Sequence, residues 1–424
     1  MARAQGARAV LAAAWEASYG APPASGFFSL PFAAWSLDSE QGLIPDDLLG
    51  LGRDPADPSL DVVNANGDAR VPIDLRNFGL WLRLIFGAPT TTQVAASGSL
   101  VFGGQPAVGA TVTINGTTFV FVAGSPNAGE IEIGATLADT LDNIEAELNG
   151  SADADVDDAT YAALGGDTIT VTHDAAGPAG NAFTLAASAN SNALASAATL
   201  TGGAYKHLFA SGSWDLPSMA AEIGNPEVPN YRLIAGIMAN QISVQLQRSG
   251  LLSATIGLIA QGSDKATLSQ AGSPTPVLAV ERFAQFNGAV LKDGAALGSV
   301  VSASFTYANN LDLIETIRDD GKIDGADPSV AALTGQAVVR FASNTLIDQA
   351  IVKEPCELAY THTINAGKKL VWTAHRVFLP KPKIPIEGPR GLQATFDWQA
   401  AKDSAPARMF TAELFNDVAS YAWR

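Results

Sequence analysis

The chain has 424 residues, of which 47% are hydrophobic and 16% charged. This composition excludes a disordered chain and predicts two or three folding units. The 42 acidic and 25 basic residues give a net charge of −17, which opposes direct binding to nucleic acid or to an anionic membrane surface. Cys356 is the only cysteine, which excludes an intrachain disulfide, makes a Cys-based zinc site very improbable, and suits folding in a reducing cytoplasm.

The first segment, residues 1–19, resembles a secretion signal only superficially. Arg3 and Arg8 precede a short apolar run, but Glu16 closes that run and no clear small-residue cleavage site follows. No window of the chain approaches the roughly 18 apolar residues that a membrane span requires. The alanine content predicts a helical arm here instead.

A buried helix is expected at residues 77–86, and the charge pattern changes just beyond it. No Lys or Arg occurs between Arg83 and Lys206, whereas twelve acidic residues do. These acidic residues are Glu130, Glu132, Asp139, Asp142, Glu145, Glu147, Asp153, Asp155, Asp157, Asp158, Asp167 and Asp174. A linker-like segment at residues 88–92 and a glycine pair at 202–203 close the stretch on its two sides.

The change of composition predicts that one domain of the chain is discontinuous in sequence. We expect residues 1–93 and 203–424 to form one β unit, and residues 94–202 to form an inserted acidic α+β domain. Within the insert, Asn115-Gly116 separates two apolar runs and predicts a tight hairpin turn. Residues 168–172 alternate with period two and predict a strand, and residues 183–185 predict another short one.

An amphipathic helix is predicted between these strands. Its apolar residues recur at helical spacing, at Leu137, Leu141, Ile144 and Leu148. Thr136 is placed to cap the first turn, and Gly150 to end the last. The sequence therefore predicts that the insert is a ββαββ-like unit in which one helix packs on one sheet.

The flanking parts are rich in short alternating strands, as expected for antiparallel β structure. In one strand Ile242, Val244 and Leu246 alternate with Ser243, Gln245 and Gln247. In another, Leu392, Ala394, Phe396, Trp398 and Ala400 alternate with Gln393, Thr395, Asp397 and Gln399. Each strand is thus apolar on one face only, and solvent exposure is sufficient to explain the polar face. Residues 343–352 carry a helical stripe.

A search for catalytic and metal-binding patterns finds none that is complete. Asp153, Asp155 and Asp157 occupy the first, third and fifth positions of a calcium loop, but Asp158 and Leu164 stand where glycine and a bidentate carboxylate are required. A solvated acidic loop is the favoured interpretation. No nucleophile elbow, phosphate loop or dinucleotide fingerprint occurs.

The four histidines do not show the spacing of a metal site either. His362 and His375 lie on opposite arms of a hairpin predicted around residues 365–368, so they could approach each other. No third ligand accompanies them, and ordinary strand positions are the favoured interpretation. We expect no enzyme activity and no cofactor.

Taken together, the order of these segments resembles the tail tube proteins of long-tailed bacteriophages with non-contractile tails. The segments that carry the resemblance are residues 16–20, 27–32, 67–75, 78–87, 304–311, 320–323, 333–341, 386–388 and 392–398, continuing to Leu414. It covers most of residues 1–90 and 204–424. The middle part looks like a module inserted in various phage structural proteins.

The resemblance implies a mainly β chain with an antiparallel sandwich or barrel core and one or two helices. It implies a virion protein assembled in the bacterial cytoplasm into stacked hexameric rings, whose inner strands pair edge to edge around the path of ejected DNA. The partners implied are further copies, the tape measure protein, the tail terminator and transiting double-stranded DNA that is not bound specifically. No membrane partner is expected.

Two sets of residues are candidates for these roles. The polar strand positions named above, Ser243, Gln245, Gln247, Gln393, Thr395, Asp397 and Gln399, are candidates for the channel wall. The long segment at residues 38–68, rich in Pro, Gly and Asp, is the candidate bridge between rings. Its candidate contact residues are Leu43, Ile44, Asp46, Asp47 and Arg53. The acidic insert is expected on the tube exterior.

Three alternatives remain open. A tail terminator or a baseplate subunit would form single rings instead of tubes. A secreted carbohydrate-binding β-sandwich adhesin would carry a cleavable signal and be retained on glycan columns. A metal-dependent hydrolase would need a cluster of His and carboxylate side chains that the sequence does not visibly supply.

Overall fold

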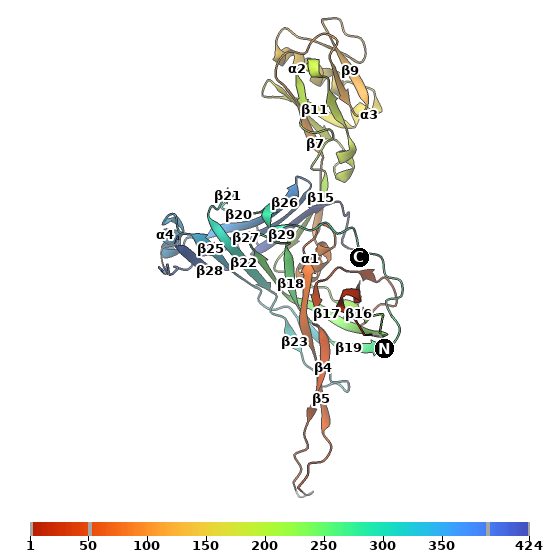
Figure 1. The fold of residues 1–424 in the computed structure, drawn as a ribbon, viewed down its shortest axis with the longest axis vertical. Helices are drawn as coiled ribbons and strands as arrows, with labels where there is room; N and C mark the ends of the chain where they lie inside the picture. The colour runs from red at the N-terminus through yellow and green to blue at the C-terminus, as the bar shows by residue number, and fades with distance from the viewer. Residues whose placement is uncertain (1–2, 50–52, 387–390, 423–424) are drawn as a thin grey trace.

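The computed structural model describes residues 3–49, 53–386 and 391–422. Over these residues the protein is mainly antiparallel β, with sheets that pack as a sandwich rather than close into a barrel. The predicted fold class is therefore confirmed. Figure 1 shows a broad β body from which a separate lobe and a long two-stranded hairpin extend in opposite directions.

The larger layer of the body is a sheet that we call the polar-faced sheet. Its strands pair in the order β4-β5-β18-β17-β22-β25-β28. Their bounds are β4 (Asp38–Ile44), β5 (Ser59–Pro72), β18 (Ser253–Ile259), β17 (Asn230–Leu246), β22 (Val300–Ala308), β25 (Ala332–Arg340) and β28 (Gln393–Ala400). A short strand, β3 (Ala34–Trp35), also pairs with β5.

The second layer, the opposing sheet, covers the apolar face of the first. Its strands pair in the order β20-β26-β27-β29-β15-β6. Their bounds are β20 (Gly288–Lys292), β26 (Cys356–Asn365), β27 (Lys368–Phe378), β29 (Phe410–Asn416), β15 (Ala204–Ala210) and β6 (Thr90–Val94), and β21 (Ala295–Ala296) pairs with β20. The hairpin predicted around residues 365–368 is thus present.

Aromatic rings hold the two layers together. Phe305 on β22 lies 5.2 Å, centroid to centroid, from both Trp372 and Phe410 of the opposing sheet, and 5.6 Å from Tyr360. All four rings are buried. Ring pairs of this kind add about 0.5–1.5 kcal/mol each beyond their area burial. The apolar residues of β22 therefore face the core, and its polar residues lie on the opposite face of the sheet.

Two helices flank the sandwich, close to where the sequence predicts them. Helix α1 (Phe78–Phe86) is buried along almost its whole length, and Phe86 packs 4.9 Å from Tyr307. Helix α4 (Thr345–Val352) joins β25 to β26 and is mostly exposed. Both segments carry apolar residues that pack against the main core, which explains why the periodicity located them.

The N-terminal segment is a strand, so the predicted helical arm is wrong. Strand β1 (Val10–Trp15) follows a single 3-10 turn at Gly6–Arg8 and pairs with β16 (Met219–Asn225) and β2 (Phe28–Ser29). β16 continues the layer to the first half of β17, which also pairs with β19 (Gly262–Ala266). Pairing on both sides outweighs the weak helix propensity of an alanine run.

The insert has its own hydrophobic core, made of buried residues between Ala96 and Leu200. It contains two four-stranded sheets rather than the single sheet expected. One comprises β10 (Glu130–Glu132), β9 (Thr117–Val122), β8 (Thr111–Ile114) and β13 (Leu185–Ala187); the other comprises β11 (Ala159–Leu164), β12 (Thr168–His173), β7 (Ser97–Phe102) and β14 (Ala193–Ala195). Strand β13 begins at Leu185, because residues 178–182 form a 3-10 turn.

Local signals in the insert are confirmed. Asn115 and Gly116 both have positive φ and turn β8 into β9. Helix α2 (Leu137–Asn149) begins with a capping box, in which Thr136 accepts from the Asp139 amide and Asp139 accepts from the Thr136 amide, and its C-cap is Gly150. Short-range chemistry alone determines these features.

A short helix and a separate pair of strands lie outside these layers. The acidic run at residues 153–158 forms α3 (Ala154–Asp157), whose first turn is capped by the Asp153 carboxylate. Strands β23 (Asp312–Ile314) and β24 (Gly325–Asp327) form a separate pair beside the base of the long hairpin. Of the segments that carry the resemblance, Glu387 and Gly388 lie outside the described residues.

Candidate functional site

The candidate channel residues lie on one face of the polar-faced sheet. Ser243 on β17 pairs laterally with Thr306 on β22, which pairs with Thr334 on β25, which pairs with Gln399 on β28. Directly paired residues of an antiparallel sheet project to the same side. One continuous polar row therefore crosses four strands.

A second row runs parallel to the first. Gln245 pairs with Ser304, Ser304 with Gln336, and Gln336 with Asp397. The Gln336 amide donates to the Asp397 carboxylate at 2.7 Å, and in the first row the hydroxyls of Ser243 and Thr306 lie 2.9 Å apart. These bonds hold neighbouring strands in register on the polar side, as the aromatic rings do on the apolar side.

The structure brings together most of the predicted residues and adds others. Thr395 and Gln393 continue the face along β28, opposite Val338 and Arg340. Gln247 lies just past the end of β17, where its amide donates to Gln285. The sequence argument missed Ser304, Thr306, Thr334 and Gln336, although the alternation in β22 and β25 carries the same signal.

The polar face carries a small excess of acidic side chains. Its charged residues on the paired strands are Asp38, Glu40, Asp68 and Asp397, against Arg70 and Arg340. Most of the net charge of the chain lies elsewhere. Thirty acidic and 25 basic residues remain once the twelve acidic residues between Arg83 and Lys206 are set aside, so the rest of the chain carries −5.

The predicted bridge at residues 38–68 is the hairpin of β4 and β5. It continues as a two-stranded ribbon beyond the end of β18, whose last pairing is Ile259 with Asn66. Figure 1 shows it projecting far from the body. Near its far end Leu43 is 63% exposed and Ile44 48% exposed. Residues 50–52 lie outside the described residues.

The far end of the hairpin combines apolar and acidic side chains. Leu48 and Leu49 are 68% and 96% exposed. Asp46 is half-buried, its carboxylate accepting from the Leu48 amide, and Asp47 and Arg53 are exposed. These leucines form an apolar surface that no other described part of the chain covers.

The base of the same hairpin is held firmly. The Gly321 carbonyl accepts from the Val63 amide at 2.9 Å. Asp38 forms an ion pair with Arg232, and its carboxylate also accepts from the Ser263 hydroxyl at 2.9 Å. The ribbon is therefore fixed at one end and uncovered at the other.

The histidines are not brought together. His362 is fully buried on β26, and burial lowers its pKa to about 4. His375 lies near the other end of the β26–β27 hairpin, where its ring bonds to Glu357 and Thr411. His207 bonds to Thr91 and to the C-terminal segment.

The described residues contain neither a metal-binding cluster of side chains nor a membrane-spanning helix. No group of three or more His, Cys, Asp or Glu side chains there is arranged to hold a metal ion. The acidic run at 153–158 instead serves local structure, with Asp153 accepting from Thr117 at 2.8 Å. None of the helices within those ranges has the length and apolar character to span a bilayer.

Comparison with known proteins gives one family. A family model described as phage tail tube protein matches residues 6–400, nearly the whole chain and including the insert region. No curated protein matches the chain significantly.

Proposed function

The chain belongs to the phage tail tube protein family, and from this premise we propose that it forms closed rings of six copies that stack into the DNA conduit of a non-contractile tail. The observation that carries this proposal is the continuous polar face, which crosses β17, β22, β25 and β28 while the other face is filled by the core. Such a sheet can line a water-filled channel and support it from behind. The protein is a structural tail component, and the proposal assigns it no catalytic role.

Ring closure uses the free edges of this sheet. On its outer side β28 pairs with β27 only through Gln399 and Ala400, so Gln393–Trp398 present an unpaired edge among the described residues. The opposite edge is formed by β3 and β4 beside β5. Pairing of β28 in one copy with that edge in the next removes both exposed edges, and repetition of the contact closes a ring.

DNA passes through this channel without being retained because the wall offers no excess of positive charge. Affinity for DNA arises mainly from Lys and Arg that neutralise phosphates. The polar face carries Asp38, Glu40, Asp68 and Asp397 against Arg70 and Arg340, and electrostatic screening limits the reach of charges elsewhere to about 10 Å at 0.1 M salt. A polar wall with a small excess of acidic side chains repels the phosphates weakly and does not hold them.

The insert lies on the outside of the tube in this arrangement. It occupies the turn between β6 and β15, which pair through Val94 and Ala204 in the opposing sheet. That sheet lies behind the polar-faced sheet, so the insert is attached to the layer farther from the channel. The acidic surface of the insert then faces solvent, where it decorates the tail.

The aromatic residues of the insert do not favour a role in glycan recognition. The five aromatic residues of residues 94–202 are all buried, namely Phe102, Phe119, Phe121, Tyr161 and Phe183. Small-molecule sites usually expose aromatic side chains in a cleft.

The partners that follow from the tube function are further copies of the chain, the tape measure protein, the tail terminator and passing DNA. Assembly takes place in the bacterial cytoplasm.

Negative-stain microscopy of the purified protein tests the proposal. We expect tubes, or stacked rings with six-fold symmetry, as concentration increases. Isolated rings that never stack would favour a terminator or baseplate subunit instead. A monomer at every concentration, together with absence of the protein from the tail shaft of particles, contradicts the proposal.

A further inference from the structure

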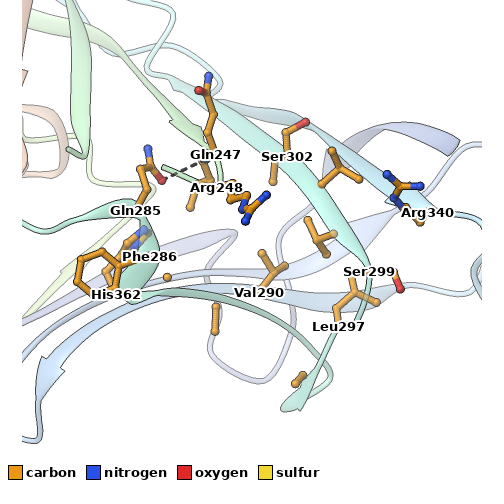
Figure 2. Close-up of a pocket in the computed structure, with 17 residues that line it drawn as sticks. Gln247, Arg248, Gln285, Phe286, Val290, Leu297, Ser299, Ser302, Arg340 and His362 are labelled. Carbon is orange, nitrogen blue, oxygen red and sulfur yellow. Dashed lines mark hydrogen bonds between the residues drawn. The ribbon is translucent and has the colours of Figure 1, made fainter. Parts of the chain in front are cut away.

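The β sandwich leaves parts of its surface open. Besides the unpaired edge of β28, it has a groove of about 640 Å³ between β20, β22, β26 and the end of β17. Figure 2 shows apolar side chains along the floor of this groove, among them Val290 and Leu297, with Arg248 and Arg340 at its margins and His362 at one end. The insert differs from the sandwich in this respect, because other parts of the insert cover its strand edges.

The two sheets of the insert are joined at one side. Residues 193–201 pair with β7 through β14, and on their other side they pair with the segment that leads into β13. There the Leu185 amide donates to the Ala198 carbonyl at 2.9 Å, and the Leu200 amide donates to the Phe183 carbonyl at 2.9 Å. One segment therefore connects both sheets into a single wrapped layer, whose outer strands are β10 and β11.

Helix α2 lies against both of these outer strands. On β11, the Tyr161 amide donates to the side-chain oxygen of Asn149 at 3.0 Å, and the Asn149 side chain donates to the Tyr161 carbonyl at 2.8 Å. The Ala163 amide donates to the Glu145 carboxylate at 2.7 Å. Strand β12 occupies the other side of β11, so these side chains take the positions that a neighbouring strand would otherwise fill.

The edge of β10 is covered in the same way. The Asn143 side chain donates to the Glu132 carbonyl at 3.0 Å, and the Glu147 carboxylate accepts from the Gly129 amide at 3.3 Å just before the strand. The apolar face of α2 is buried in the core of the insert, so the helix is held in place while its polar side chains bond to the strands. An uncovered edge is a template for pairing with a strand of another molecule, and α2 covers the two that the insert would otherwise present.

The insert also carries charge of one sign. Twelve acidic residues and no Lys or Arg lie between Arg83 and Lys206. Identical inserts therefore repel one another at close range, with a reach of about 10 Å at 0.1 M salt. Repulsion acts at the distance at which strand edges would begin to pair, so the charge and the covered edges oppose the same contact.

We propose that the insert is a spacer that prevents assembled tubes from adhering to one another, and that α2 makes this possible by covering the edges of β10 and β11. The inference rests on the stacked-ring function proposed above. A tube displays one insert per copy along its whole length, so an uncovered edge would be repeated many times. Weak pairing of single edges would then become strong adhesion between tubes, because linked contacts add avidity.

Removal of the α2 side chains that cover β11 tests the proposal. The double variant, Glu145→Ala with Asn149→Ala, eliminates all three bonds to Tyr161 and Ala163. In negative-stain micrographs its tubes are expected to gather into bundles, whereas wild-type tubes stay dispersed. Low-speed sedimentation is expected to show the same loss of dispersed protein. Tubes of the double variant that are as dispersed as those of the wild type overturn the proposal.

Asp142→Ala is the matched control. Asp142 is exposed on the same helix, and its replacement removes one negative charge, as Glu145→Ala does, but none of the three bonds. Tubes of this variant are expected to stay dispersed. Equal bundling of the control and the double variant assigns the effect to charge alone and overturns the role given to α2.

Ala163→Pro, added to the double variant, separates edge pairing from damage to the insert. Proline has no amide hydrogen and is tolerated in an edge strand where that amide faces outward, as the Ala163 amide does towards Glu145. The triple variant is expected to form dispersed tubes again. Bundles that persist come from an exposed core instead, and they overturn the proposal.

Failure of the tube function gives a different result. A wild-type protein that forms no tubes contradicts that function. Light scattering of the unassembled chains then compares the double variant with the control, and equal scattering from the two overturns the role given to α2.

Discussion

His362 illustrates how a single buried residue can make stability depend on pH. It is fully buried on β26 and burial lowers its pKa to about 4, below the 6.5 of an exposed imidazole. Above pH 6.5 the ring is neutral in both the folded and the unfolded chain. As the pH falls from 6.5 towards 4, only the unfolded chain takes up the proton, so folding stability decreases.

We therefore expect the His362 ring to cost the protein up to about 3 kcal/mol of unfolding free energy between pH 6.5 and pH 4, with no further loss below pH 4. Urea unfolding of the wild type and of His362→Leu at pH 7 and pH 4.5 measures it. The stability of the variant relative to the wild type is expected to improve at pH 4.5. An equal difference at both pH values would show that the imidazole is protonated in the folded chain.

At the scale of the element, helix α2 of the insert depends on its capping box. The Thr136 hydroxyl accepts from the Asp139 amide at 3.2 Å, and the Asp139 carboxylate accepts from the Thr136 amide at 2.9 Å. Thr136→Ala removes one of these bonds and is expected to lower the stability of the insert by about 1 kcal/mol. Thermal unfolding measures the loss.

The control for this prediction is Thr172→Ala, which removes an exposed hydroxyl on β12 outside the helix and is expected to change stability by less than about 0.5 kcal/mol. Tube assembly is expected to continue in both variants, because the insert has its own core. A loss of tubes with Thr136→Ala would mean that the insert takes part in the ring or axial contacts.

The N-terminal element shows the limit of local signals. Val10–Trp15 contains three alanines, which favour a helix weakly, yet the segment forms β1. Its backbone pairs with β16 from Val10 to Trp15 and with β2 at Ala12 and Ala13. These partners lie far away in the sequence, so no window around residue 12 contains the information that decides its structure.

At the scale of the whole molecule, the insert is separable from the sandwich. We expect that replacing residues 95–203 with Asn-Gly, which closes the turn between Val94 and Ala204, leaves a chain that still forms tubes. The tubes should be narrower in electron micrographs, and the net charge per chain should change from −17 to −5. A folded deletion variant that forms no tubes contradicts an external, dispensable insert.

The lack of excess positive charge on the proposed channel wall leads to a different prediction. Gln245→Lys with Gln336→Lys places two cations in the second polar row, which phosphates then contact. DNA is expected to be retained by such tubes, and phage carrying them to eject more slowly, with the effect decreasing as salt increases. Ejection rates at two ionic strengths measure it.

The control for this prediction carries the same charge change outside the channel. Leu164→Lys with Leu194→Lys lies on exposed positions of the insert and is expected to leave ejection unchanged. If the control slows ejection as much as the channel pair does, position on the polar face has no special role.

The sequence alone determined the features that depend on neighbours in the chain. Alternation along β17 and β28, the Asn115-Gly116 turn, the caps of α2 and the acidic composition between Arg83 and Lys206 all follow from residues a few positions apart. Such signals are local, because rotation about the backbone and side-chain hydrogen bonds act over one or two turns.

Only the tertiary structure decided how these elements meet. Period-two alternation shows that a strand has a polar face but not which strand lies beside it, so the rows from Ser243 to Gln399 could not be read from the sequence. The same holds for the second sheet of the insert, for β1 and for the groove beside His362. Each depends on pairing between residues distant in the chain, and that pairing is selected by the packing of the whole core rather than by any local preference.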